Sequence, residues 1–304
     1  SPTTESGNLS QSYIAANISV SATNFETVTI YLYNTSGLYN HSNSSSPEYY
    51  VLFNNLPDGT YYLNATTTNT FGVENSVETV TIALDTVAPT LEINGPVDNY
   101  NSSLIDINFT FIATESSMAN CSLYSDEEGY VAYLLRDSNN SISSGETTIL
   151  NMSSLNERTY NWYITCIDIT GNSNTSSTRQ FIVDYSAPSI TVSSPVANSS
   201  AGSVVYIYTE ITDSLTSIGQ ASYTIYNGSN LLSSGSLNSS NNWDSVWNSS
   251  AYGEVEMNLT LVITANDTVG NLATSNVSFY LDNVNPVIQL VRPPELLTYY
   301  NSNF

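Results

Sequence analysis

The stretch Asp85-Thr86-Val87-Ala88-Pro89 decides the fold, because it returns twice at nearly constant spacing. Its later copies are Asp184-Tyr185-Ser186-Ala187-Pro188 and Asp282-Asn283-Val284-Asn285-Pro286, which places the three prolines 99 and 98 residues apart. A turn of the pattern Asp-x-x-Gly-Asn stands ahead of the second and third copies, at residues 168–172 and 267–271. Several motifs that keep one register along a chain indicate a tandem repeat.

Each repeat is predicted to be a β-sandwich. Apolar and polar residues alternate as they do in strands, and no stretch of useful length has the period of a helix. In the middle repeat the pattern predicts strands at residues 91–93, 105–113, 121–125, 160–167 and 178–183. Roughly seven strands in about 100 residues is the size of an immunoglobulin-like sandwich. Tyr61 and Tyr160 each follow a Leu by five residues and resemble the tyrosine corner of such folds, whereas the third repeat has Leu259 there.

The predicted fold class is therefore all-β, with three tandem immunoglobulin-like β-sandwich domains and an extra strand at the C-terminus. The predicted bounds are residues 1–86, 87–185 and 186–283 for the domains and 284–304 for the extra strand. A chain so rich in Asn, Ser and Thr could also be disordered. Against disorder, 40% of the residues are hydrophobic and 23 are Tyr, which is enough apolar material to build cores.

The charge excludes several classes of partner. The 304 residues include 27 Asp and Glu but only 4 basic residues, all Arg, so the formal net charge is −23. Too few cations exist to neutralise a nucleic-acid backbone or to hold the chain on an anionic membrane. No run of about 20 apolar residues predicts a membrane-spanning helix. No basic and apolar leader opens the chain, so either a signal has been removed or the chain is a segment of something larger.

Asn-x-Ser/Thr sequons are the most frequent motif, and they accept N-linked glycans in secreted proteins. The 19 candidates are Asn8, Asn17, Asn34, Asn40, Asn43, Asn64, Asn101, Asn108, Asn120, Asn139, Asn151, Asn174, Asn198, Asn227, Asn238, Asn248, Asn258, Asn266 and Asn276. A polar surface could form sequons by accident. Against accident, Asn17, Asn108 and Asn258 occupy the outward phase of predicted strands, where Asn is otherwise disfavoured. The sequons predict an extracellular chain that carries covalent N-linked glycans.

Two cysteines, Cys121 and Cys166, lie in the middle repeat on strands expected to be neighbours in one sheet. An oxidising exterior favours a disulfide between them, and two buried free thiols are the alternative. In the repeat alignment the expected counterparts are Ile30 and Tyr223 for Cys121, and Thr67 and Ala265 for Cys166. A zinc site is not credible with two Cys and one His.

The repeat is out of frame with the chain. The middle and third repeats begin with an apolar strand after the junction proline, at residues 90–93 and 189–192, but the first repeat has no such strand. Its first alternating run, residues 13–22, corresponds to the second strand of the others. After the third repeat the chain has one more strand of the missing type, at residues 286–291.

Two explanations of this displacement remain open. In the first, the C-terminal strand of one copy completes the first domain of the next, which is donor-strand complementation and gives a head-to-tail homopolymer. The donor strand would then be Val287, Ile288, Gln289, Leu290 and Val291, and the acceptor edge would carry Ile14, Ala16, Ile18 and Val20. In the second, the chain is a window of a longer tandem array.

The residues predict neither catalysis nor a cofactor beyond the glycans. The only His is His41, in a Ser- and Asn-rich stretch where a solvated residue is expected, so no catalytic residue is predicted. No metal site is predicted either. Junction acids Asp85, Asp184 and Asp282 are weak calcium candidates together with the turn acids, because carboxylates suit Ca²⁺, but a turn capped by its own Asp is the simpler interpretation. Outward Tyr residues could bind sugars or simply reflect β-propensity; they are Tyr31, Tyr33, Tyr206 and Tyr208.

The Asp-x-x-x-Pro junctions, the Asp-x-x-Gly-Asn turns and the corner Leu56-Pro57-Asp58-Gly59-Thr60-Tyr61 resemble tandem immunoglobulin-like or fibronectin-III-like repeats of archaeal cell-surface proteins. The resemblance covers nearly the whole chain and specifies a type of module. Together with the displaced strand and the sequons, it predicts a structural subunit of an N-glycosylated extracellular filament, a pilus-like or thread-like surface appendage. Its partners would be copies of itself, and possible further partners are other filaments or surface glycans. The alternative is a fragment of a longer stalk, S-layer-type protein or adhesin.

Overall fold

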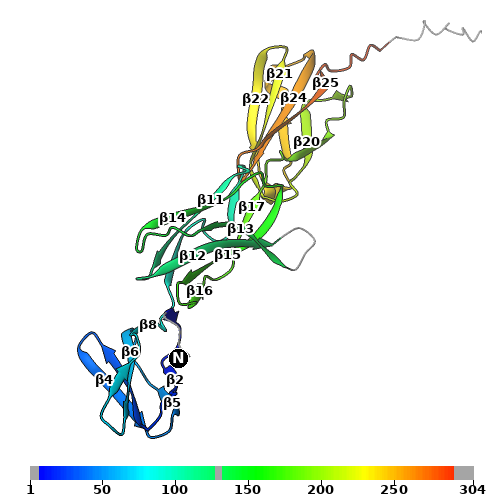
Figure 1. Ribbon diagram of the computed structural model, residues 1–304. Helices are drawn as coiled ribbons and strands as arrows, with labels where there is room; N and C mark the ends of the chain where they lie inside the picture. The colour runs from blue at the N-terminus through cyan, green and yellow to red at the C-terminus, as the bar shows by residue number, and fades with distance from the viewer. Residues whose placement is uncertain (1–6, 127–131, 291–304) are drawn as a thin grey trace, which may run out of the picture. The chain divides into compact units, whose positions relative to one another are not determined.

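The computed structural model describes residues 7–126 and 132–290, and β-strands make up most of them (Figure 1). The chain divides into two compact units. One comprises residues 1–100 and 104–183, and the other comprises residues 101–103 and 184–304. Three separate hydrophobic cores lie within these units, and each falls inside one of the predicted domains. The predicted all-β fold of tandem immunoglobulin-like sandwiches is confirmed.

The first sandwich has a large sheet and a very small one. Its strands are β1 (Gly7–Leu9), β2 (Ile14–Ser19), β3 (Phe25–Asn34), β4 (Gly37–Ser44), β5 (Glu48–Phe53), β6 (Gly59–Asn69), β7 (Glu74–Ser76) and β8 (Val80–Leu84). The large sheet has the order β1-β8-β6-β3-β4 with β7 on β6, and the second sheet is only β2-β5. Side chains of both sheets, including Ile14, Ile30 and Ile82, form a dry core between them.

The middle sandwich repeats this plan with one more strand. Its strands are β9 (Thr90–Gly95), β10 (Tyr100–Ser102), β11 (Ile107–Thr114), β12 (Met118–Asp126), β13 (Tyr133–Asn139), β14 (Thr147–Met152), β15 (Arg158–Asp168), β16 (Ser173–Thr175) and β17 (Arg179–Val183). The sheets are β10-β17-β15-β12-β13, with β16 on β15, and β14-β11-β9. Trp162 is fully buried in the core, with its ring centroid 4.6 Å from that of Phe109 in an edge-on contact. All five strands predicted in this repeat are present, with ends that differ by a few residues.

The third sandwich has the same two sheets. Its strands are β18 (Ser189–Ser194), β19 (Ser200–Ala201), β20 (Val204–Thr212), β21 (Ile218–Asn227), β22 (Asn230–Leu237), β23 (Ser245–Asn248), β24 (Glu256–Asp267) and β25 (Leu272–Asp282), with two 3-10 turns, η1 (Ser239–Asn241) and η2 (Ser250–Tyr252). The sheets are β19-β25-β24-β21-β22 and β18-β20-β23. Burial alternates along β20, which is the period of two that the sequence predicted. No helix in the described ranges is long and apolar enough to cross a bilayer.

Candidate functional site

The predicted disulfide between Cys121 and Cys166 is present. The two residues lie directly opposite each other on β12 and β15, and both are fully buried. The bond therefore joins neighbouring strands of one sheet inside the core of the middle sandwich.

The counterparts expected for Cys166 are correct, whereas those expected for Cys121 are wrong by two residues. The structural equivalents of the pair are Val28 opposite Thr67 and Ala221 opposite Ala265. The expected Ile30 and Tyr223 lie two positions further along the same face. A shift of two leaves the inward and outward pattern of a strand unchanged, so alternation alone cannot detect it.

Two of the three repeats contain a tyrosine corner. The hydroxyl of Tyr61 donates to the Pro57 carbonyl at 2.9 Å, and that of Tyr160 donates to the Asn156 carbonyl at 3.1 Å. In the third repeat Leu259 pairs with Phe279 at the equivalent place and has no hydroxyl to donate. The sequence prediction for this motif is confirmed in each repeat.

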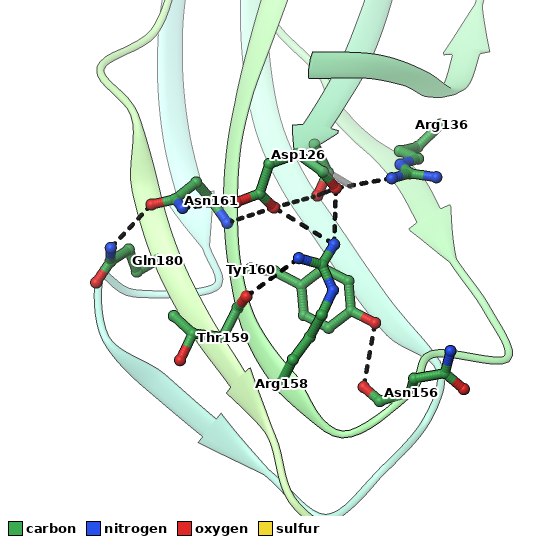
Figure 2. A network of polar contacts seen from close by, with 9 residues as sticks. Asp126, Arg136, Asn156, Arg158, Thr159, Tyr160, Asn161 and Gln180 are labelled. Carbon is green, nitrogen blue, oxygen red and sulfur yellow. Dashed lines mark hydrogen bonds and ion pairs between the residues drawn. The ribbon is translucent and has the colours of Figure 1, made fainter. Parts of the chain in front are cut away.

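A polar network ties the end of β12 to its neighbours in the middle repeat (Figure 2). The guanidinium groups of Arg136 and Arg158 both donate to the Asp126 carbonyl at 2.7 Å, and Arg158 also lies 3.5 Å from the Asp126 carboxylate. Asn161 donates to the same carboxylate through its backbone and side-chain amides, and the Arg158 guanidinium lies 3.8 Å from the centre of the Tyr160 ring. These contacts hold strands together, and the sequence analysis missed them.

The linker before the middle sandwich is held by a row of side-chain amides. Asn172 Nδ2 donates to the Asp85 carbonyl at 2.8 Å and to the Val87 carbonyl at 3.2 Å. Asn174 Nδ2 donates to the Pro89 carbonyl at 2.9 Å, just where β9 begins. The two repeated sequence motifs therefore belong to one device, in which the turn clamps the junction.

The Asp of each turn shapes the clamp. Asp168 Oδ1 accepts the N–H groups of Thr170, Gly171 and Asn172 at 2.8–2.9 Å, and Oδ2 accepts Asn172 Nδ2 at 2.9 Å. Burial favours the neutral acid, but the hydrogen bonds from Thr170 and Asn172 outweigh it and hold the pKa of Asp168 below its usual value. Asp168 therefore caps its own turn.

The third repeat has the same clamp. Asp267 Oδ1 accepts the N–H groups of Val269, Gly270 and Asn271, and Asn271 Nδ2 donates to the Asp184 carbonyl at 2.9 Å. In the first repeat Asn69 caps the turn through the N–H groups of Phe71 and Val73, but Val73 stands where the others have the clamping Asn. Phe71 and Val73 are 77% and 62% exposed.

The calcium candidates Asp85, Asp184 and Asp282 occupy three different junctions, and the structure does not bring them together. Asp85 and Asp282 each accept the N–H group two residues ahead, as turn residues do. Asp184 accepts the Ser186 N–H in the same way, and it also lies with Asp213 and Asp267, with carboxylate oxygens within 4.8 Å of one another. Burial, and then the charge of Asp213, raise the pKa of Asp184, although the Thr216 hydroxyl opposes them. Sequence reasoning missed Asp213, and calcium binding stays the weaker alternative to a capped turn.

The acceptor edge lies on β2. Ile14, Ala16 and Ile18 point into the core, and Val20, just past the strand end, is half-buried. β2 is shorter than the predicted strand at residues 13–22. The Val20 N–H still donates to the Pro47 carbonyl in the same register, but Pro47 has no N–H to donate back. Among residues 7–126 and 132–290, β2 pairs with β5 alone, whereas β11 and β20 each pair on both sides.

The donor segment is outside any sheet in the described part of the chain. Val287, Ile288 and Leu290 are 93%, 92% and 88% exposed, and residues 283–290 have no assigned strand. Val291 and the remainder of the predicted extra strand lie outside the described residues. Exposed groups of large apolar side chains such as these are typical of surfaces that bind another protein segment.

The sequons lie where a glycan could be attached. Of the 19 Asn residues, 14 are exposed and 5 are half-buried, namely Asn34, Asn64, Asn120, Asn139 and Asn266. Some side-chain amides already have structural roles, since Asn174 Nδ2 binds the linker and Asn151 Nδ2 donates to the Ile107 carbonyl at 3.2 Å. A glycan leaves the side-chain nitrogen one N–H, so a glycosylated Asn151 could keep only one of its bonds to the Ile107 carbonyl and Asn108 Oδ1.

The outward tyrosines form pairs along their strands. The ring centroids of Tyr206 and Tyr208 are 5.7 Å apart, and those of Tyr31 and Tyr33 are 6.2 Å apart. His41 is exposed as expected, but it lies in β4 and not in a loop, and its ring stacks 6.2 Å from that of Tyr31. Sugar binding by these rings stays a prediction.

The known proteins to which this chain is similar contain immunoglobulin-like modules. The bacterial Ig-like domain (group 3) family matches residues 145–240. A tetra-tandem repeat from the extending region of a large adhesion protein is 18% identical, with a TM-score of 0.36, and the match covers 93% of this chain and 73% of that one. Titin domains I67–I69 are 10% identical, with a TM-score of 0.43 and coverage of 92% and 94%. No curated protein matches the chain.

A further solved structure comes from a 1.5-MDa bacterial ice-binding adhesin. It is 15% identical, with a TM-score of 0.38, and the match covers 91% of this chain and 94% of that one. None of these similarities assigns a function to this chain.

Proposed function

We propose that the chain is the structural shaft of an extracellular cell-surface protein, built from tandem immunoglobulin-like repeats. The observation that carries this proposal is the clamped junction. The linker at residues 85–89 runs directly into the first strand of the next sandwich, and Asn172 and Asn174 hold it by its carbonyl groups. Asn271 repeats the clamp on Asp184. A string of sandwiches joined in this way has no free hinge between a junction and the strand that follows it.

Two features support a location outside the cell. The Cys121–Cys166 disulfide suits an oxidising compartment, because thiols in the cytosol are kept reduced. The sequon Asn residues lie at the surface, where N-linked glycans are added in secreted proteins. A glycan coat would also hydrate a surface that has few charges. The archaeal source that the sequence suggests stays a prediction.

The test is localisation of the native protein. Antibodies raised against the chain should label intact cells of its source, and mass spectrometry of the native protein should find glycan-bearing Asn peptides. Labelling only after the cells are made permeable, with unmodified Asn peptides throughout, would show that the proposal is wrong.

A second candidate function is the subunit of a head-to-tail filament, and a separate observation favours it. Among the described strands, β2 of the first sandwich pairs with β5 alone, and the segment after the third sandwich exposes Ile288 and Leu290. Unpaired edges and exposed apolar strands are ordinarily protected in native proteins. Joining the two features between copies would protect both of them, with other copies of the chain as the partners.

A further inference from the structure

We propose that β2 of the first sandwich binds residues 286–290 of a second copy of the chain in one defined register, with a groove beside β2 as the binding site. This inference rests on the filament candidate above and adds the register, the contact residues and the side chains that select the strand. In the middle repeat the equivalent strand, β9, pairs with β11 of the same chain. The register of that pair predicts the register of the bound segment on β2.

The first step is the register of the middle repeat. There β9 pairs antiparallel with β11, so that Leu91 faces Ala113, Glu92 faces Ile112 and Ile93 faces Phe111. Leu91 and Ile93 pack against the core, while Thr90 and Glu92 are exposed. Two inward side chains, separated by one outward residue, therefore anchor this strand to the core.

The second step transfers this register to β2. Ile107 faces Met152 at the start of β11, and Ile14 faces Phe53 at the start of β2. The two strands are thus equivalent with an offset of 93 residues. The partners of a bound strand would be Ile18, Ser19 and Val20, in place of Phe111, Ile112 and Ala113.

The third step identifies the side chains of the bound segment that would enter the groove beside β2. Counting from the junction prolines, Ile288 takes the place of Leu91 and Leu290 takes the place of Ile93. Gln289 takes the outward place of Glu92. The bound segment would therefore set Ile288 against Val20 and Leu290 against Ile18, with Gln289 opposite Ser19 on the solvent side.

A groove lies where this strand would pack. It has a volume of about 320 Å³ and is lined by residues 18–22 of the β2 end, 65–69 of β6 and 73–77 of the β7 region. In the middle repeat β9 lies against the equivalent strands, since it pairs with β11 and its first residues are bound by Asn174 on β16. The groove is thus the space that β9 side chains fill in the complete sandwich.

The rim of the groove differs from the clamps in a way that suits this segment. Asn75 stands where Asn174 stands, because each faces the residue equivalent to Cys166, and it would donate to the Pro286 carbonyl. The clamping Asn172 is replaced by the exposed Val73. The incoming segment is more apolar in turn, since Val287 replaces Thr90 and is 93% exposed in the free chain. Val287 would stay on the solvent side as Thr90 does, and the Asn75 amide is the rim contact that the segment would keep.

The first experiment compares two adjacent substitutions in the full 304-residue chain. Self-association is measured against concentration by analytical ultracentrifugation, with electron microscopy of the products. Ile288→Asp places a charge in the groove and should weaken association at least roughly tenfold, as the loss of a buried aliphatic side chain alone would. Gln289→Asp adds the same charge on the solvent side and should change association by less than about twofold. Both residues lie outside the folded cores, so folding is not at stake.

The second experiment fixes the register by cross-linking. Ser19→Cys with Gln289→Cys should give a ladder of disulfide-linked oligomers on a non-reducing gel. Ala15→Cys with Gln289→Cys is the matched control, because Ala15 is on the same face but four residues away, about 13 Å along the strand, too far for a disulfide. A ladder of equal strength in both variants, or a cross-link closed within single chains, would overturn the proposal.

The outcomes separate this site from the proposed functions. A chain that associates equally with Ile288→Asp and with Gln289→Asp contradicts the groove but leaves self-association in place. A chain that stays monomeric at every concentration overturns the groove and the filament candidate together. Neither result affects the cell-surface shaft, which is tested by labelling of intact cells.

Discussion

The first and middle sandwiches share a strand plan and differ in how each is closed. The middle one is closed by its own linker strand β9, by the Cys121–Cys166 bond and by the Asn172 clamp. The first one has a two-stranded second sheet and Val73 at the clamp position. The comparison teaches that, among the described residues, both sandwiches bury a core between two sheets although only the middle one has a strand paired on the far side of its second strand.

The difference also shows which interactions depend on sequence and which on the fold. Both repeats retain the tyrosine corner and the capped turn, since these are formed by residues a few positions apart. The clamp joins residues 85 or more positions apart and the extra strand pairs residues 15–24 positions apart. Of these two repeats, only the middle one has both among the described residues. Substitutions that exchange these features between the two repeats measure what each contributes.

The largest effect is expected from the disulfide. Cys121→Val with Cys166→Thr installs the pair that the first repeat has at Val28 and Thr67. The free energy of unfolding of the middle repeat should fall by about 2–4 kcal/mol, because the unfolded chain is no longer cross-linked. Hydrogen exchange followed by mass spectrometry measures this repeat by repeat. An unchanged middle repeat, or an equal loss in the third, would contradict the prediction.

The clamp should have the next largest effect. Asn172→Val installs the residue of the first repeat and removes hydrogen bonds to the Asp85 and Val87 carbonyls and to Asp168. A loss of about 1–2 kcal/mol is expected in the middle repeat, with faster exchange of amides at the start of β9. Val73→Asn is the reciprocal control, and it should leave the first repeat within about 0.5 kcal/mol of its original stability. Equal effects of the two substitutions would show that the linker is not what Asn172 stabilises.

Removing the hydroxyl of a tyrosine corner should lower the free energy of unfolding by a smaller amount, which should be equal in the two repeats. Tyr160→Phe and Tyr61→Phe each remove one hydroxyl that donates to a backbone carbonyl. Each repeat should lose about 1 kcal/mol, measured by urea unfolding of the full chain with exchange to assign the repeat. A loss confined to Tyr160→Phe would contradict the equivalence of the two corners, because Phe keeps the ring over which the Arg158 guanidinium lies.

The smallest effect concerns pH and the turn Asp. Hydrogen bonds lower the pKa of folded Asp168 despite its burial, so this group stabilises the fold above its unfolded pKa of about 4. That contribution is lost as the pH falls through the lower folded pKa. Asp168→Asn installs the uncharged residue found at Asn69, and its difference from the natural chain should narrow as the pH falls below about 4. A difference that widens in acid would contradict the assigned direction.

Most of the architecture could be predicted from the sequence, because its signals are local. The alternation along β15 and β20, the junction prolines and the Tyr160 corner each involve residues close together in the chain. The alignment of Cys121 failed by two positions because a strand pattern repeats every two residues. The network around Asp126 could not be predicted, since it joins residues from three strands.

The sequence by itself determined that this chain is a tandem array of β-sandwiches with both cysteines in the middle repeat. Only the tertiary structure decided that the turn amides clamp the linkers, that Asp213 joins Asp184 and Asp267, and that a groove lies beside β2. The physical reason is the range of the interactions. Periodicity and turn chemistry act over a few residues, whereas clamps, charge clusters and grooves arise where distant strands meet.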